Sequence, residues 1–305
     1  MTAASRRETM IGLAAALGAF IAWGFAPIYF KAIAFIPALE ILAHRVIWTL
    51  VMLVVIVLAL GRIREVALTL LSPRRLGVLC VTTLLVSTNW LVFIWAIQND
   101  RLLEGSLGYY INPLVNVVLG VVFLSERLSR WQGVAVALAA AGVAAMVIGI
   151  GTVPWVALTL ALSFGFYALV RKKAKVDPLI GLVVETLLLL PLALAYLIWL
   201  GNQGTGAFDP ADWSLSALLV CSGLVTGTPL VLFMHGAQRL TLSTIGLMQY
   251  LAPSIHFLLA LLIFGEEFTR THLVTFGFIW IGLALYSWDA MNRYRRETAD
   301  AAAGA

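Results

Sequence analysis

Ten long apolar segments constrain the fold of this chain more than any other feature of its sequence. A helix needs about 20 apolar residues to cross the roughly 30 Å hydrocarbon core of a bilayer. Segments of this kind cover residues 10–30, 38–60, 76–97, 103–124, 131–150, 153–170, 179–200, 215–236, 243–264 and 272–290. The connections between them are short, so they leave no room for a separate domain outside the membrane. The sequence therefore predicts an all-α polytopic membrane protein with ten transmembrane helices.

The balance of apolar and charged residues excludes several classes of protein. Hydrophobic residues make up 62% of the chain and charged residues 11%, whereas soluble domains carry about 45–50% and about 25%. This balance excludes a soluble enzyme, a secreted disulfide scaffold and a disordered interaction protein. The sequence contains no glycine-rich phosphate loop, His-Glu-x-x-His pattern or Cys/His cluster. We therefore expect neither an enzyme nor a bound metal or cofactor.

Lys and Arg residues gather in every second connection, which sets the expected orientation. Sixteen of the 20 basic residues lie on the side that holds both termini, whereas Lys31, Arg101 and Arg270 lie on the other. Cytoplasmic loops carry such an excess of positive charge, so we expect both termini in the cytoplasm. We also expect a retained first helix rather than a cleaved signal peptide, and a disordered tail over residues 291–305. The basic residues form short groups rather than one face, so no nucleic-acid partner is expected.

The two halves of the chain repeat each other at a shift of 140 residues. The aligned pairs with distinctive side chains are Tyr110 and Tyr250, Pro113 and Pro253, Glu126 and Glu266, Arg130 and Arg270, and Gly142 and Gly282, with Gly24 and Gly165 paired at a shift of 141. Each half holds five spans, and because five is odd the second half enters the membrane from the opposite side. The sequence thus predicts two inverted five-helix repeats, over residues 1–150 and 151–290. Inverted repeats are the structural basis of alternating access in many transporters.

Prolines lie inside several of the predicted spans. Pro27, Pro113, Pro229 and Pro253 each remove a backbone donor within an apolar segment, so we predict helix breaks at these positions. The matched pair Pro113 and Pro253 is the pattern expected of helices that border a central binding site. Simple kinks that help the helices pack are the alternative.

Polar and aromatic side chains at membrane depth are the candidate lining of a substrate cavity. We predict this role for Trp23, Asn89, Trp90, Tyr110, Asn112, Asn116, Gln249 and Tyr250. Aromatic walls with a few polar groups are typical of pockets for organic molecules. Hydrogen bonds between helices are the alternative for the amides, and anchoring at the membrane interface is the alternative for the aromatic residues.

Ionisable residues stand out at four positions within the spans, where a charge costs at least about 2.5–3.5 kcal/mol. Glu40, His44 and Arg45 share the second span, and Glu185 holds the position related to His44 by the shift of 141. We predict that these residues serve proton coupling, with His44 and Glu185 as the candidate carriers. An ion pair between Glu40 and Arg45 near the outer surface is one alternative, and a structural carboxyl at Glu185 is the other.

Several longer motifs resemble a known family. They are Trp23-Gly24-Phe25-Ala26-Pro27, Glu40-Ile41-Leu42-Ala43-His44-Arg45, Gly108-Tyr109-Tyr110-Ile111-Asn112-Pro113-Leu114-Val115-Asn116, Glu185-Thr186 and Phe278-Ile279-Trp280. On these residues the chain resembles the RarD group of the EamA family, within the drug/metabolite transporter superfamily, over nearly its whole length. The resemblance implies a ten-span permease of the bacterial inner membrane whose fifth and tenth helices stand outside the cavity. It also implies an association with chloramphenicol sensitivity or resistance.

Together these observations predict a secondary-active transporter that exports a small organic metabolite or drug by alternating access, with proton coupling as a further hypothesis. Its partners would be a small-molecule substrate and the lipid bilayer, and it would act as a monomer or a homodimer. A passive pore or lipid scramblase, conducting without alternating access, is the alternative.

Overall fold

The computed structural model describes residues 3–125, 127–174, 176–209, 212–240 and 242–303, which contain helices and no strand. The helices are α1 (Ala3–Ala32), α2 (Ala38–Ala59), α3 (Ile63–Leu70), α4 (Pro73–Gln98), α5 (Leu102–Leu124), α6 (Arg130–Ile150), α7 (Trp155–Ala174), α8 (Pro178–Gln203), α9 (Trp213–Ala237), α10 (Leu242–Met248), α11 (Leu251–Leu262) and α12 (Arg270–Ala303). Within these residues, 10 segments are long and apolar enough to cross a bilayer. The predicted all-α polytopic fold with ten spans is confirmed.

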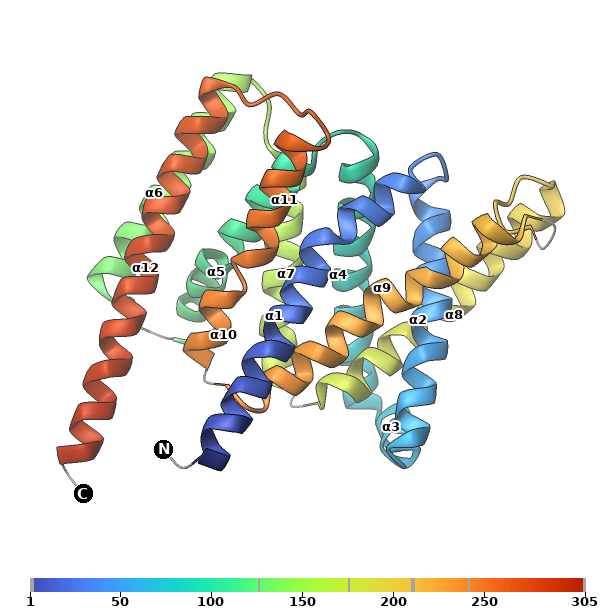
Figure 1. The fold of residues 1–305 in the computed structure, drawn as a ribbon, viewed down its shortest axis with the longest axis horizontal. Coiled ribbons are helices and arrows are strands. Elements are labelled where there is room, and N and C mark those ends of the chain that lie inside the picture. The colour runs from blue at the N-terminus through green and yellow to red at the C-terminus, as the bar shows by residue number, and fades with distance from the viewer. Residues whose placement is uncertain (1–2, 126, 175, 210–211, 241, 304–305) are drawn as a thin grey trace.

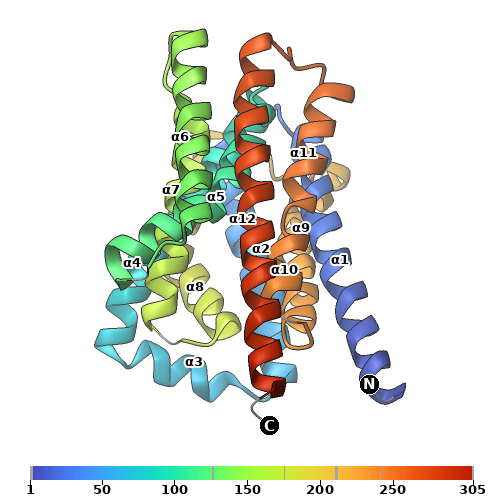
Figure 2. The ribbon, with the colours of Figure 1, turned by 90° about the vertical axis from the view of Figure 1, so that its left-hand side faces the viewer.

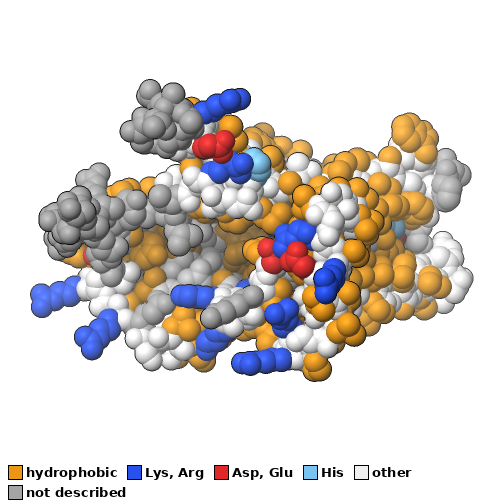
Figure 3. All heavy atoms as spheres, turned by 90° about the horizontal axis from the view of Figure 1, so that it is seen from below, with side chains coloured by type: hydrophobic (Ala, Val, Ile, Leu, Met, Phe, Trp, Pro, Cys, Tyr) orange, Lys and Arg blue, Asp and Glu red, His pale blue; other side chains and the backbone are white. Residues whose placement is uncertain are grey.

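Both termini lie at the same end of the helical bundle (Figure 1), as a turned view also shows (Figure 2). We call this end the terminal side and the other end the opposite side. Figure 3 views the terminal side and shows many Lys and Arg side chains projecting from it. Exposed basic residues of the connections at this end include Arg64, Arg74, Arg75, Lys172 and Lys173. The side that the sequence assigned to the cytoplasm therefore carries a cationic face.

The packing of the helices follows a two-fold relation between the halves. Helix α1 packs on α9 and α11, and its repeat counterpart α7 packs on α4 and α5, the counterparts of α9 and of the α10–α11 pair. Helix α2 likewise contacts α9, as its counterpart α8 contacts α4, and α2 and α8 contact each other. Each of these contacts has a partner when the two halves are exchanged. The fold is thus built from two five-span repeats.

Close contacts at glycines follow the same exchange. A Cβ on Gly142 of α6 would lie 3.0 Å from the carbonyl oxygen of Thr275, and one on Gly282 of α12 would lie 2.9 Å from that of Ala135. Residues 142 and 282, and likewise 135 and 275, are 140 positions apart. Small residues let membrane helices approach closely. The two peripheral helices α6 and α12, side by side at one edge of the bundle (Figure 1), therefore meet through reciprocal contacts.

A second reciprocal contact lies in the body of the bundle. A Cβ on Gly24 of α1 would lie 2.5 Å from Ile255 on α11, and one on Gly165 of α7 would lie 2.8 Å from Val115 on α5. Gly24 and Gly165 are the pair aligned at a shift of 141, and Val115 and Ile255 are 140 positions apart. The weak sequence repeat thus corresponds to equivalent interfaces in three dimensions.

The short helix α3 lies at the terminal side between α2 and α4 and was not predicted from the sequence. It buries Val66 and Thr69 and leaves Leu68 exposed, so it is amphipathic, and its length of 8 residues is too short to cross a membrane. At its start, Arg62 binds Glu65 through two hydrogen bonds of 2.6 and 2.7 Å and approaches Asp177 before α8 at 3.2 Å. The Arg62 guanidinium lowers the pKa of the Glu65 carboxyl.

Most of the predicted helix breaks are wrong. Pro27, Pro113 and Pro229 lie inside α1, α5 and α9, each of which is continuous through its proline. In a bundle, neighbouring groups can satisfy the carbonyl that a proline leaves free, so the helix continues. Only the segment near Pro253 is interrupted, because the ninth span is split between α10 and α11 just before this residue.

The predicted disordered tail also differs from the structure. Helix α12 continues beyond the membrane-spanning part, which ends at Asn292, and reaches Ala303. Ala, Arg and Glu are strong helix formers, which accounts for helix in a segment without an apolar face. Residues 304–305 of the predicted tail lie outside the described residues, as does Glu126 of the predicted repeat.

Candidate functional site

The most unusual charge at membrane depth is Arg45 on α2. All residues from Glu40 to Val46 are buried because α2 is enclosed by α4, α8 and α9. The guanidinium carbon of Arg45 lies 4.3 Å from the ring centroid of Trp90 and 5.5 Å from that of Phe30. Its Nε and Nη1 atoms are buried and have no hydrogen-bond partner. Within the described part of the chain, no carboxylate forms an ion pair with Arg45.

The energetics of this arrangement are unfavourable for a purely structural arginine. A desolvated cation–π contact contributes about 2 kcal/mol, whereas a charge at membrane depth costs at least about 2.5–3.5 kcal/mol. Buried donors left unpaired add about 1–3 kcal/mol each. Trp90 and Phe30 therefore offset only part of the cost of burying Arg45.

A histidine from the second half reaches the same region. Proline at position 27 has no N–H, so the carbonyl of Trp23 lacks its partner within α1. The Nε2 atom of His256 on α11 lies 3.1 Å from this carbonyl oxygen. A carbonyl oxygen accepts only, so Nε2 carries the proton and Nδ1 is left as an acceptor. That Nδ1 atom is buried without a partner.

Tyr109 on α5 lies in the same region and is held by Asn89 on α4. Its hydroxyl donates to Oδ1 of Asn89 at 3.2 Å, while Nδ2 of Asn89 donates to Ser163 and to the carbonyl of Leu160 on α7, both at 3.0 Å. Asn89 is thus fully engaged in holding α4, α5 and α7 together, and it fixes the position of Tyr109.

Aromatic contacts complete the assembly. The Phe93 ring packs against Phe30, Tyr109 and His256, with centroid separations of 6.4, 5.5 and 5.2 Å. We call the following residues the central cluster: Phe30, Arg45, Trp90, Phe93, Tyr109 and His256. Five of them come from α1, α2, α4 and α5 of the first half, and His256 comes from the second half. The cluster therefore lies where the two halves meet.

Glu185 forms a separate buried site nearer the terminal side. It is 1% exposed, and its two oxygens accept from the hydroxyls of Thr82 at 2.6 Å and Tyr167 at 3.2 Å. Arg171 on α7 supplies a cation, with 3.7 Å between Nη1 and Oε1. The guanidinium passes directly over Gly181, where a Cβ would lie 1.7 Å from Nη1. The sequence showed no cation in the same span, because this one comes from the neighbouring helix.

The other two predicted ionisable residues point away from Arg45. Oε1 of Glu40 accepts from the backbone N–H of Ala207 at 2.6 Å, and the His44 ring stacks on Phe208 with 5.5 Å between centroids. The Nε2 atom of His44 is buried without a hydrogen-bond partner. The Glu40–Arg45 ion pair, the alternative to proton coupling, is not formed, because the connection after α8 binds the Glu40 carboxylate.

The remaining predicted cavity residues do not gather in one place. The Tyr110 hydroxyl lies 2.6 Å from that of Ser254, and its ring stacks on Tyr250 with 6.4 Å between centroids, facing α12 rather than the central cluster. Asn112 donates to the carbonyl of Ala161 on α7 at 3.2 Å and accepts from Asn116 at 3.1 Å. The Tyr110 and Asn112 contacts join neighbouring helices, whereas the Asn116 contact lies within α5.

Trp23 and Gln249, the last two predicted cavity residues, lie outside the central cluster. Trp23 is half-buried and packs on Phe20 and Phe233, and Gln249 lies at the break between α10 and α11. Sequence reasoning missed Phe30, Thr82 and Arg171, since nothing in an apolar helix shows which neighbour its side chains will meet. The spacing of four residues from Trp23 to Pro27 was the one available signal for a free carbonyl.

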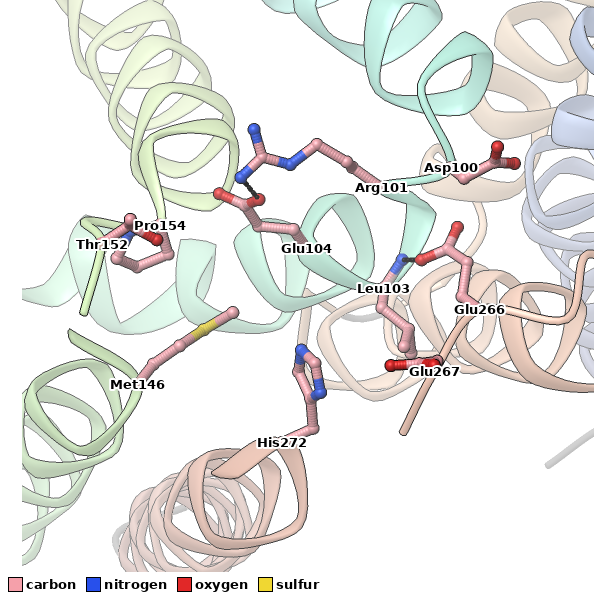
Figure 4. A pocket seen from close by; sticks show the side chains of 10 residues that line it. All are labelled: Asp100, Arg101, Leu103, Glu104, Met146, Thr152, Pro154, Glu266, Glu267 and His272. Carbon is pink, nitrogen blue, oxygen red and sulfur yellow. Dashed lines mark hydrogen bonds and ion pairs between the residues drawn. The ribbon is translucent and has the colours of Figure 1, made fainter. Parts of the chain in front are cut away.

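A pocket of about 230 Å³ lies at the opposite side, where charged residues hold the starts of two helices (Figure 4). Glu266 accepts from the backbone N–H groups of Leu102 and Leu103 at 2.6 and 2.8 Å, at the start of α5. Glu104 accepts from the N–H of Val156 at 2.8 Å, at the start of α7, and its other oxygen lies 2.7 Å from Arg101. Carboxylates stabilise helix N-termini, so these contacts hold the opposite side together.

Burial raises the pKa of the Glu266 carboxyl, although the two backbone hydrogen bonds act in the other direction. Lys31 of α1 binds Asp100 and the carbonyl of Ile97 on the same side. The described residues contain no group of three or more His, Cys, Asp or Glu side chains that could hold a metal ion. The carboxylates at this pocket clamp the starts of α5 and α7 to their neighbours.

Comparison with known proteins agrees with this architecture. The model of the EamA-like transporter family matches residues 10–148 and again residues 152–288. An "Uncharacterized transporter" of Vibrio cholerae is 51% identical over 94% of this chain and 95% of its own length. "Protein RarD" of Escherichia coli is 44% identical over 95% and 98%.

Two further comparisons extend this result. "Chloramphenicol-sensitive protein RarD" of Pseudomonas aeruginosa is 34% identical over 94% of this chain and 96% of its own length. A solved crystal structure with 21% sequence identity superposes with a TM-score of 0.55 over 92% of this chain and 96% of the other, which supports the fold. With two matches to one family model and relatives of high coverage, the chain belongs to the EamA-like transporter family of multi-pass membrane proteins.

Proposed function

We propose that this chain is a secondary-active transporter of the bacterial inner membrane that exports a small organic metabolite or drug by alternating access. The family match and the transporter names of the relatives support the general class. The cationic terminal side supports an orientation with both termini in the cytoplasm. Helices α6 and α12 lie at one edge of the bundle (Figure 1), which is consistent with a peripheral role outside the transport path.

The observation that carries this proposal is the reciprocal packing of the two halves. Two halves that exchange equivalent interfaces can adopt two related arrangements, one open to each face of the membrane. In the arrangement seen here, Glu266 and Glu104 hold the starts of α5 and α7 together at the opposite side. Asn116, in the half of α5 toward the terminal side, is exposed. This supports a conformation closed at the opposite side.

Labelling of a single cysteine tests alternating access. Asn116→Cys is placed in a background with Cys80 and Cys221 replaced by Ala, and an impermeant maleimide is applied to vesicles of each orientation. We expect fast labelling from the terminal side and slow labelling from the other. Adding Glu266→Gln should weaken the clamp, so labelling from the terminal side should fall while labelling from the opposite side rises. A pore or scramblase would instead label from both sides, and both rates would change in the same direction.

Proton coupling through Glu185 and His44 is a further part of the proposal. Protonation of Glu185 would remove the charge that attracts Arg171 and so free the α7–α8 contact, which gives the proton a structural effect. We expect Glu185→Gln to transport at a rate that no longer depends on a pH gradient. Glu65→Gln, which alters an exposed ion pair at the same side, is the matched control. Unchanged coupling in Glu185→Gln would remove Glu185 from the mechanism, and His44→Gln tests His44 in the same way.

A further inference from the structure

We propose that the substrate is an organic anion with one carboxylate, and that Arg45 binds this carboxylate. The proposal rests on the transport function proposed above and adds the chemical class of the substrate. Its basis is Arg45, a residue that is only 8% exposed, lies where the two halves meet, and has Nε and Nη1 atoms without a hydrogen-bond partner.

Every carboxylate that is buried in the described part of the chain is engaged away from Arg45. Their partners are Ala207 for Glu40, Arg101 and the start of α7 for Glu104, Thr82, Tyr167 and Arg171 for Glu185, and Ser129 for Asp289. Glu185 is paired with Arg171 and contacts a different level of α4 from Arg45. Thr82, which contacts it, and Trp90, which contacts Arg45, are eight residues apart on α4, about 12 Å along the helix axis.

The surroundings of Arg45 indicate what the missing anion looks like. The central cluster holds one guanidinium and no other cation, so one negative charge balances it. The faces of Trp90, Phe30 and Phe93 favour an apolar or aromatic body. A guanidinium binds a planar carboxylate with good geometry. A singly charged organic acid therefore matches the cluster.

Neutral and zwitterionic molecules fit less well. A neutral molecule such as chloramphenicol would leave the Arg45 charge without a counter-ion. The central cluster has no carboxylate to meet the ammonium group of a zwitterion; it offers only neutral acceptors such as Nδ1 of His256, which has no partner. The net charge of the substrate thus decides the match.

The contrast with Arg171 and Arg101 separates a structural arginine from a binding one. Arg171 donates to two backbone carbonyls at 3.3 Å and pairs with Glu185. Arg101 lies near the rings of Trp95 and Trp155 and pairs with Glu104 at 2.7 Å. Arg45 has the aromatic contacts and lacks the anion. The geometry leaves that position for a molecule that the protein carries.

Thermal unfolding of the purified full chain with three matched probes tests the proposal. The probes are phenylacetate, its neutral amide phenylacetamide, and the zwitterion phenylalanine, each titrated against wild type, Arg45→Lys, Arg45→Gln and the control Arg101→Gln. We expect phenylacetate to raise the unfolding midpoint of wild type and of Arg101→Gln, with little effect of the other two probes. In Arg45→Gln, the phenylacetate concentration for half the effect should rise about 10- to 100-fold, the loss expected for one charge-assisted contact. Arg45→Lys should be intermediate.

The midpoint without a probe supplies an independent readout. Arg45→Gln should unfold at the same or a higher temperature than wild type, because it removes an unpaired buried charge. A lower midpoint would show that Arg45 stabilises the fold and would overturn the proposal. An equal response to phenylacetamide, a phenylacetate response that survives in Arg45→Gln, or no response to phenylacetate would also overturn it.

Transport distinguishes failure of this proposal from failure of the proposed function. Proteoliposomes are loaded with labelled phenylacetate or phenylacetamide, and their release is followed. Release of the amide alone would leave the transporter standing and overturn the anionic substrate. Equal labelling of Asn116→Cys from both sides would overturn alternating access itself, whatever the response to phenylacetate.

Discussion

Replacement of Gly181 by Ala tests how the buried carboxylate of Glu185 is neutralised. The added Cβ would lie 1.7 Å from Nη1, 2.3 Å from Cζ and 2.4 Å from Nη2 of Arg171. No real contact is this short, so the guanidinium must move away. It would lose its hydrogen bonds to the carbonyls of Asp177 and Pro178 and its approach to Glu185. The carboxylate would keep only its two hydroxyl partners.

The magnitude follows from two opposing terms. Hydrogen bonds that involve a charged group contribute about 1.5–3 kcal/mol, and replacing Gly by Ala inside a helix gains about 1 kcal/mol. The full 3–5 kcal/mol for breaking a buried pair does not apply, because the Arg171–Glu185 distance is long and two other partners remain. We expect a net loss of about 0.5–2 kcal/mol in the free energy of unfolding, or roughly 1–8 °C in the midpoint.

The assay is thermal unfolding of the purified variants, with a second glycine as the control. A Cβ on Gly277 of α12 would meet nothing within 4 Å, so Gly277→Ala should raise the midpoint where Gly181→Ala lowers it. A double-mutant cycle with Arg171→Met isolates the cause. In that background Gly181→Ala should be neutral or stabilising. If Gly181→Ala destabilises the protein equally with and without Arg171, displacement of the guanidinium is not the reason and the account of this site fails.

Three further changes test other contacts. Since burial raises the pKa of Glu266 above its unfolded value, its contribution to stability is greatest below the unfolded pKa and is lost as the pH rises through the folded pKa. The slope of the unfolding midpoint between about pH 4 and 7 should therefore become less negative in Glu266→Gln, and an unchanged slope would contradict this. Gly142→Leu and Gly282→Leu should each lower the free energy of unfolding by a similar amount, about 1–3 kcal/mol, because the larger side chain overpacks the contact. Unequal losses would contradict the reciprocal α6–α12 contact. His256→Ala should destabilise the wild type more than it destabilises the Pro27→Ala variant, because Pro27→Ala restores the backbone donor for the Trp23 carbonyl. A double-mutant cycle of the two changes should therefore show coupling, and additive effects would contradict this.

The sequence predicted the features that depend on one helix at a time. Apolar length located all ten spans, and the distribution of Lys and Arg matched the cationic face at the terminal side. The repeat was visible because a few distinctive residues coincide at one shift. The shift aligns Gly142 with Gly282. Gly142 meets Thr275 and Gly282 meets Ala135, which are themselves equivalent positions, and this reciprocity is visible only in the assembled helices.

The features that depend on neighbouring helices were harder to predict. Pro27 was expected to break its helix, yet α1 continues and His256, more than 200 residues away, contacts the freed carbonyl. An ion pair between Glu40 and Arg45 was one alternative because both lie on α2, but the Glu40 carboxylate accepts from the backbone N–H of Ala207 instead. Depth in the membrane can be read from a sequence, whereas the partner of a side chain at that depth depends on which helix packs against it.

The two buried charges show how a symmetric frame can carry asymmetric chemistry. Arg45 and Glu185 are each the eighth residue of repeat-related helices, α2 and α8, which enter from opposite sides. Glu185 has a cation and two hydroxyls, so its site is complete within the protein. Arg45 has aromatic rings and, among the described residues, no anion, so in our proposal the substrate completes its site. Equivalent interfaces are what a change between two conformations requires, and they place no demand on charge. The charges are free to differ, and we propose that the one left incomplete selects among substrates.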